Sequence, residues 1–89
     1  MTELDEKLQA VLLSRSAGIL KCEESGIHWE EDIDEYGFDS LGVSQLCVEL
    51  NELFSIELHP ALFLEVTSLE ALSGYLKKKY YPLLERKLL

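Results

Sequence analysis

Three segments of this 89-residue chain carry apolar residues at the three- and four-residue spacing of an amphipathic α-helix. The first runs from Leu4 to Leu20, the second from about Ser40 to Phe54 and the last from Leu69 to Tyr80. No segment alternates apolar and polar residues as a half-buried strand would. A chain of this length builds one modest core. The sequence therefore predicts an all-α fold: a small four-helix bundle of three main helices plus a short third helix, with a long loop between helices 1 and 2.

In the N-terminal half of the chain, residues that favour helix ends mark where the first two predicted helices begin and where the first one stops. Thr2 is suited to cap the first helix, Ser25-Gly26 to stop it and Asp39 to cap the second. The loop over residues 25–39 is long enough to be functional. It is acidic and contains five apolar residues that we expect to anchor it to the core: Ile27, Trp29, Ile33, Tyr36 and Phe38.

In the C-terminal half, Pro60 opens the short helical turn expected over residues 61–64. Thr67 and Glu70 have the spacing of a capping box, which predicts that they open the last helix. Pro82 should kink or end that helix, so we divide the chain into a domain of residues 1–81 and an extension of residues 82–89. The Met1 start fits a discrete protein and an excised domain equally well.

The charge is unevenly distributed. The formal net charge is −9, but residues 22–76 hold thirteen acids and no Lys or Arg, while the two ends together carry an excess of positive charge. An acidic surface repels nucleic-acid phosphates and anionic lipids, so we expect no nucleic-acid or membrane partner. No leader or membrane-spanning pattern is present, and we expect a soluble, cytoplasmic protein. Cys22 and Cys47 fit no metal spacing, and both are predicted to pack as reduced thiols.

The segment Gly37–Gly42 places Ser40 at the start of the second predicted helix. A hydrolase nucleophile elbow needs Gly-x-Ser-x-Gly after a strand, whereas this sequence has Gly-x-x-Ser-x-Gly after a loop. His28 and His59 are the only candidate bases. The pattern argues against hydrolysis.

A calcium loop is a second interpretation of the same region. Counting from Asp32, the sequence offers Asp34 at position 3 and Gly37 at position 6 of an EF-hand. It places Tyr36 at position 5 and Val43 at position 12, where oxygen ligands are needed. Calcium binding stays a weak alternative, and we predict no metal site.

Covalent attachment at Ser40 is the third interpretation. A phosphate ester on this hydroxyl would meet free backbone N–H groups and the positive end of the helix dipole. Asp39 and Ser40 could equally do no more than cap the helix.

The residues around Ser40 resemble the attachment motif of the phosphopantetheine-dependent acyl carrier proteins. The resemblance covers most of the chain, from the run Tyr36–Leu41 through the second helix. It continues over positions that resemble the family's third and fourth helices: Leu58, Pro60, Leu62, Phe63, Thr67, Ser68, Leu69, Leu72 and Tyr75.

The resemblance implies a carrier and not an enzyme. Ser40 would receive 4′-phosphopantetheine from coenzyme A through a phosphopantetheinyl transferase, with Gly37, Phe38, Asp39 and Leu41 completing the motif. The arm's thiol would then hold acyl groups as thioesters for an acyltransferase, a ketosynthase and other modifying enzymes. We expect an isolated domain of this kind to be monomeric.

Phe38 makes the motif most similar to carriers of polyketide synthases that use separate acyltransferases. Carriers of those systems that direct β-branching have a tryptophan where this chain has Leu46, so a β-branching role is not expected.

The outward face of the second helix resembles the family's partner-recognition surface, on which acids meet basic patches. Val48 on it, like Leu62 and Leu64, could instead belong to the core. A non-covalent acidic adaptor that binds basic proteins is the remaining alternative. The residues assigned to the recognition face are Leu41, Ser44, Gln45, Val48, Glu49 and Glu52.

Overall fold

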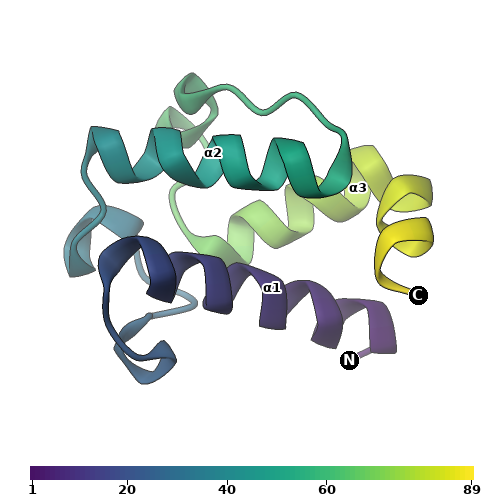
Figure 1. Cartoon of the computed structure of the whole chain (residues 1–89), viewed down its shortest axis with the longest axis horizontal. Coiled ribbons are helices and arrows are strands. Elements are labelled where there is room, and N and C mark those ends of the chain that lie inside the picture. The colour runs from purple at the N-terminus through teal and green to yellow at the C-terminus, as the bar shows by residue number, and fades with distance from the viewer.

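The computed structural model describes all 89 residues, and its regular secondary structure is helical apart from one isolated bridge between Asp32 and Ser68. Its elements are three α-helices and three 3₁₀ helices, in the order α1 (Glu3–Leu20), η1 (Glu24–Gly26), η2 (Ile33–Tyr36), α2 (Ser40–Phe54), η3 (Pro60–Leu64) and α3 (Leu69–Leu88). Helices α1 and α2 run antiparallel, and α3 crosses behind them (Figure 1). The predicted all-α fold is confirmed. The short third helix is the 3₁₀ helix η3, which buries none of its residues, so the bundle has three α-helices and not four.

The core forms where the apolar stripes of the three α-helices meet. Leucines dominate it because their side chains fill the space between helices in favourable rotamers. Phe54 is the largest fully buried side chain, and Cys47 is buried among its neighbours, where burial raises the pKa of its thiol. Cys22, by contrast, is exposed, so the prediction that it packs as a hydrophobe is wrong. The fully buried leucines are Leu8, Leu12, Leu46, Leu50, Leu69, Leu72, Leu76 and Leu84.

Helix α1 matches the predicted span of Leu4–Leu20, but the predicted stop at Ser25-Gly26 does not end it. Thr2 and Asp5 form a reciprocal capping box at its start. The helix ends when Lys21 takes a left-handed conformation with φ of 56°, and its N–H donates to the Ala17 carbonyl. Ser25 and Gly26 lie beyond this point, within η1.

The cap of α3 is one residue later than predicted. The Ser68 hydroxyl accepts the Ala71 N–H at 3.0 Å, so Ser68 and not Thr67 is the N-cap. Thr67 has a different partner, because its hydroxyl donates to Asp32 Oδ1 at 2.9 Å. A long-range hydrogen bond therefore takes the side chain that the local pattern assigns to capping.

Pro82 kinks α3, as predicted, and the helix then continues. The kink lies at Tyr80, whose φ and ψ of −124° and 25° are not helical. A proline ring clashes with the preceding turn and supplies no N–H, which accounts for the break just before it. Beyond Pro82 the chain is helical to Leu88, and Leu84 is fully buried in the core. No helix of the structure is both long and apolar enough to cross a membrane.

Candidate functional site

Ser40 is the first residue of α2, and its side chain is exposed. Figure 1 shows the start of α2 and the end of α1 together at one end of the molecule, with both chain termini at the other. The two long connections also meet near Ser40, since η2 and the residues after η3 line a hollow beside it. The serine hydroxyl is therefore exposed at the end of the bundle opposite the two chain termini.

The start of α2 is fixed by Asp39 and leaves donors free. The Asp39 Oδ1 atom accepts the Gly42 N–H at 2.8 Å, and the Asp39 carbonyl accepts the Val43 N–H at 2.9 Å. The backbone N–H groups of Ser40 and Leu41 make no hydrogen bond within the chain. Asp39 thus caps the helix as predicted, and two unpaired donors remain beside the Ser40 hydroxyl.

Two positions of the segment favour glycine, Gly37 through its backbone conformation and Gly42 through the close approach of neighbouring side chains. Gly37 has φ of +122°, a conformation that side chains disfavour, and it turns the chain out of η2. A Cβ at Gly42 would lie 3.2 Å from Phe38 Cδ1 and 3.4 Å from Asp39 Oδ1. Glycine at these positions lets the buried Phe38 side chain pack close to α2 and leaves room for the hydrogen bond between Asp39 and Gly42.

Tyr36 and Phe38 pack edge to face beneath this turn, with ring centroids 6.1 Å apart. The His28 ring also packs against Tyr36, with ring centroids 5.3 Å apart. The Tyr36 hydroxyl is buried without a hydrogen-bond partner. Burial, and then the negative charge of Glu31, raises the pKa of Tyr36 to about 12, so its phenol stays neutral at ordinary pH.

Three hydrogen bonds join the long first connection to the start of α3. Thr67 accepts the Ile33 N–H through its carbonyl at 2.8 Å and binds Asp32 through its hydroxyl. The Glu70 N–H donates to the Trp29 carbonyl at 3.0 Å. Together with buried Ile33, these bonds hold the loop in place, which agrees with the predicted role of its apolar residues as anchors.

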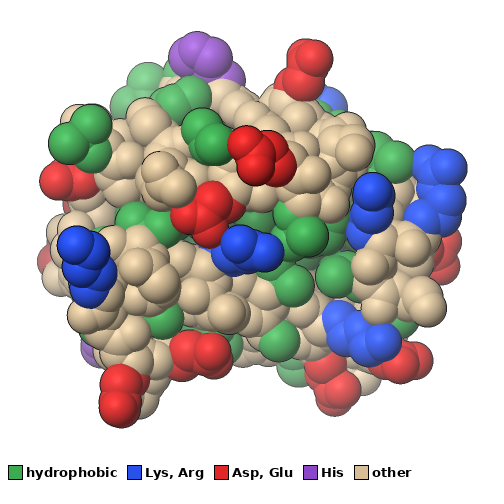
Figure 2. Space-filling view, in the orientation of Figure 1, with side chains coloured by type: hydrophobic (Ala, Val, Ile, Leu, Met, Phe, Trp, Pro, Cys, Tyr) green, Lys and Arg blue, Asp and Glu red, His purple; other side chains and the backbone are tan.

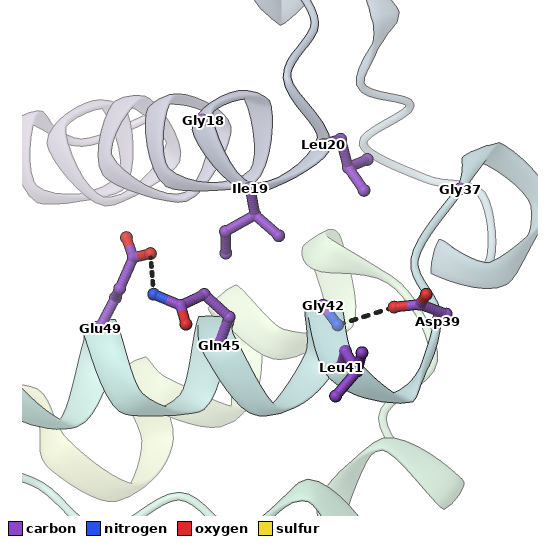
Figure 3. A pocket seen from close by; sticks show the side chains of 9 residues that line it. All are labelled: Gly18, Ile19, Leu20, Gly37, Asp39, Leu41, Gly42, Gln45 and Glu49. Atoms are coloured by element: carbon purple, nitrogen blue, oxygen red, sulfur yellow. Dashed lines mark hydrogen bonds between the residues drawn. The ribbon is translucent and has the colours of Figure 1, made fainter.

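Two shallow hollows lie on either side of the start of α2. One, of about 580 Å³, opens between α1 and α2. Figure 3 shows the Ile19 side chain directed toward α2, the Leu20 side chain toward the turn at Gly37, and the hydrogen bond between Gln45 and Glu49 along α2. The other, of about 250 Å³, includes Ser40, Phe63 and Thr67 in its lining. Neither is deep enough to enclose a substrate, which suits a presenting surface more than a catalytic pocket.

The residues assigned to the recognition face lie on one side of α2. Leu41 is 79% exposed and Val48 51% exposed, so Val48 does not belong to the core. Leu64 is 85% exposed, whereas Leu62 packs partly against the core. Ser44, Gln45 and Glu52 are exposed, and Glu49 is the half-buried member of the set.

Glu49 has a partner that sequence reasoning missed. Arg15 Nη1 lies 3.4 Å from Glu49 Oε1, and Gln45 Nε2 donates to Glu49 Oε2 at 2.9 Å. The arginine side chain is 44% exposed and the contact is single, so the pair contributes about 0–1 kcal/mol to folding. The two residues are 34 positions apart, and no local pattern signals their contact.

Neither histidine is bonded to Ser40, and the acids of the loop are not gathered around one point. His28 lies 3.6 Å from Glu31, and His59 Nδ1 accepts the Ala61 N–H. The Asp32 side chain binds Thr67. No group of three or more His, Cys, Asp or Glu residues is placed to hold a metal ion. The arrangement lends no support to hydrolytic or calcium-binding chemistry.

The start of α2 does fit a phosphate ester on Ser40. The hydroxyl is exposed, two unpaired N–H groups lie beside it, and the helix dipole favours negative charge there. The adjoining hollows are partly apolar, with Ile19, Leu20 and Leu41 on one side and Phe38 and Phe63 on the other. An arm with amide and methylene groups could rest against either side without entering the core.

Comparisons with known proteins agree with this chemistry. Residues 10–76 match the family model described as the phosphopantetheine attachment site. Over 75 residues the chain is 31% identical to the polyketide synthase PksN of Bacillus subtilis (strain 168), covering 84% of this chain and only 1% of that much longer protein. The structure resembles that of a free-standing peptidyl carrier protein from an uncharacterised secondary metabolic pathway of Acinetobacter baumannii, with a TM-score of 0.80 and 23% identity over 88% of this chain and 98% of that one. The chain therefore belongs to the phosphopantetheine attachment-site family and is a non-catalytic domain that carries a covalent 4′-phosphopantetheine arm.

Proposed function

We propose that Ser40 carries the 4′-phosphopantetheine arm and that the domain presents polyketide intermediates to separate synthase enzymes. The single observation that carries the proposal is the exposed Ser40 hydroxyl at the first position of α2, beside two unpaired backbone N–H groups. The identity with a region of a polyketide synthase supports the class of intermediate.

In this proposal a phosphopantetheinyl transferase binds the start of α2. The Ser40 hydroxyl oxygen bonds to the phosphorus that bears pantetheine in coenzyme A, the bond to the adenosine bisphosphate half breaks, and the serine proton leaves with the transferase. Asp39 holds the first turn of α2, and the N–H groups of Ser40 and Leu41 face the new negative charge. The bound arm supplies a terminal thiol that forms thioesters.

The same surface is proposed to meet the transferase, an acyltransferase, a ketosynthase and further modifying enzymes. Leu41 offers an exposed apolar contact one residue from Ser40, and Glu52 offers an exposed carboxylate further along α2. Charge complementarity at such a surface raises the association rate more than the affinity. Weak, fast contacts suit a carrier that must leave each enzyme in turn.

The deciding experiment is intact-mass measurement after incubation with coenzyme A and a broad-specificity phosphopantetheinyl transferase. Wild type should gain one phosphopantetheine and Ser40→Ala none. Ser25→Ala, which removes an exposed hydroxyl from η1 and leaves every residue of the recognition face in place, is the matched control and should be loaded like wild type. The absence of an adduct on folded wild type, or an equal adduct on Ser40→Ala, would refute the proposal.

A further inference from the structure

A trough runs between α1 and α2 along one side of the recognition face. The hollow of about 580 Å³ described above adjoins a second one of about 400 Å³, and Gly18 and Glu49 line both. The shared residues make the two hollows neighbouring parts of one depression. It extends from Leu41, beside the attachment serine, to Arg15 on α1.

Gly18 keeps this trough open. No atom lies within 4 Å of a Cβ built at Gly18, and the residue is exposed within α1. A glycine inside a helix weakens it relative to alanine, and here neither a positive φ nor a close approach requires one. The missing side chain leaves open space where the two hollows meet.

The trough combines apolar walls with a carboxylate that already binds a guanidinium. Ile19, Leu20 and Leu41 supply the apolar side, as Figure 3 shows. Glu49 is bound by Arg15 through a single 3.4 Å contact. Arg15 is the one basic residue that lines the trough, and its contact shows the chemistry that this position accepts: a cation on an aliphatic stem.

We infer that the trough between α1 and α2 is the docking groove for an arginine or lysine side chain of a partner protein, and that Arg15 is an internal competitor which this side chain displaces from Glu49. The inference rests on the proposed function and deepens it, since it names the chemistry of the partner. The incoming stem lies against Ile19, and its charged head replaces that of Arg15 at Glu49. The acidic centre of the chain attracts the same kind of partner from a distance.

The arrangement makes Arg15 a specificity residue for this surface. A partner without a basic side chain at this point gains nothing from displacing Arg15, whereas a basic partner must break the Arg15 contact before it binds Glu49. The native pair is weak, so the cost is small and the carrier still associates and dissociates rapidly.

Arg15→Gln tests the competition. Binding to the phosphopantetheinyl transferase with coenzyme A present is measured by calorimetry at low salt, in a Ser40→Ala background so that no transfer occurs. Arg15→Gln should lower Kd by about two- to fivefold, the fold-change that corresponds to one half-exposed ion pair. The gain should vanish when Glu49→Gln is added, because the competition then has no target.

The matched control is Lys7→Gln, which removes the same charge from α1 at a residue that pairs with Glu3 away from the trough. It should change Kd far less than Arg15→Gln. Equal effects would reduce the result to net charge and overturn the inference, as would weaker binding by Arg15→Gln.

Gly18→Leu tests the groove. It fills the trough and should raise Kd by about fivefold or more, as the loss of a central interface contact does, without lowering the melting temperature. Gly74→Leu is the matched control, since a Cβ at Gly74 also meets no atom within 4 Å but lies on a separate hollow. Unchanged binding by Gly18→Leu would overturn the inference. Loading of wild type but not of Ser40→Ala would leave the proposed function intact in that case, so the two failures are distinguishable.

Discussion

The end of the molecule that holds Ser40 and the end that holds the two termini are stabilised by different interactions. At the Ser40 end, buried apolar anchors and backbone hydrogen bonds stabilise the fold, and no acid of residues 30–39 pairs with a Lys or Arg; Glu31 lies 3.6 Å from His28. At the terminal end, an ion pair between Asp5 and Lys77 joins α1 to α3. On the face of the molecule that Figure 2 draws, most Lys and Arg side chains lie toward the end with the termini.

This difference separates charge used for folding from charge available to partners. Near Ser40 the structure does not depend on most of its carboxylates, so they remain free to meet basic proteins. At the terminal end opposite charges are paired within the chain, and Leu84 adds a buried contact. Substitutions at the two ends should therefore alter different properties: loading and docking at one, stability at the other.

Leu84→Ala should have the largest effect on stability. Leu84 is fully buried beyond the kink at Tyr80, and truncating a buried leucine costs about 2–5 kcal/mol through lost burial and the cavity left behind. The free energy of unfolding is measured by denaturant titration followed by circular dichroism.

Leu89→Ala is the control, because Leu89 is 59% exposed at the end of the same segment and its truncation should cost no more than about 0.5 kcal/mol. Equal small losses from both variants would mean that residues 82–89 act as the separate extension expected from Pro82, and the comparison of the two ends would lose its main structural element.

Asp39→Ala should come next, with a loss of about 0.5–2 kcal/mol, because it removes the carboxylate that caps α2. The free first turn should also slow loading at Ser40. Asp39→Asn keeps a cap acceptor and should recover most of the unfolding free energy. If Asn does not recover it, the role of Asp39 at this end is its charge and not its hydrogen bond to Gly42.

The position of α2 could be predicted from the sequence because its determinants are local. Asp39 caps the helix, the apolar stripe begins at Val43, and Phe54 ends it, so the predicted and observed bounds agree. The resemblance around Ser40 is local in the same sense. The kink before Pro82 follows from the proline ring alone.

Features that depend on distant residues could not be predicted in this way. Thr67 and Ser68 can both cap α3, and the choice between them depends on Asp32, which is 35 positions from Thr67 in sequence. The pairing of Glu49 with Arg15 likewise joins residues that are far apart in sequence. The burial of Leu84 requires knowing that the chain folds back on the core after the kink, which the sequence around Pro82 does not specify.

Thr67→Val should have a smaller effect than the loss of the Asp39 cap. It removes the hydroxyl that binds Asp32 but keeps the size and branching of the side chain. A hydrogen bond of this kind contributes about 0.5–1.5 kcal/mol, and its exposure places it at the low end. Amide hydrogen exchange at Ile33 should accelerate, whereas Thr67→Ser, which keeps the hydroxyl, should leave it unchanged. Equal exchange in both variants would show that the backbone bonds alone hold the loop.

The smallest effect should come from the Asp5–Lys77 pair, and it should depend on pH. The Lys77 ammonium, followed by the Thr2 backbone N–H, lowers the pKa of Asp5 from 3.8 to about 2. The pKa of Asp5 is lower in the folded state than in the unfolded chain. The contribution of the pair to the free energy of unfolding is therefore fully present above about pH 4 and is lost as the pH falls toward 2. Lys77→Gln should raise the Asp5 pKa toward its ordinary value, measured by NMR titration of the carboxyl carbon, and should lower the melting temperature at pH 6 more than at pH 2.

Lys78→Gln removes the same charge from a neighbouring exposed residue and should leave the Asp5 titration in place. If both variants shift that titration equally, the terminal end is stabilised by its general positive charge and not by this pair, and the contrast with the Ser40 end becomes one of net charge alone.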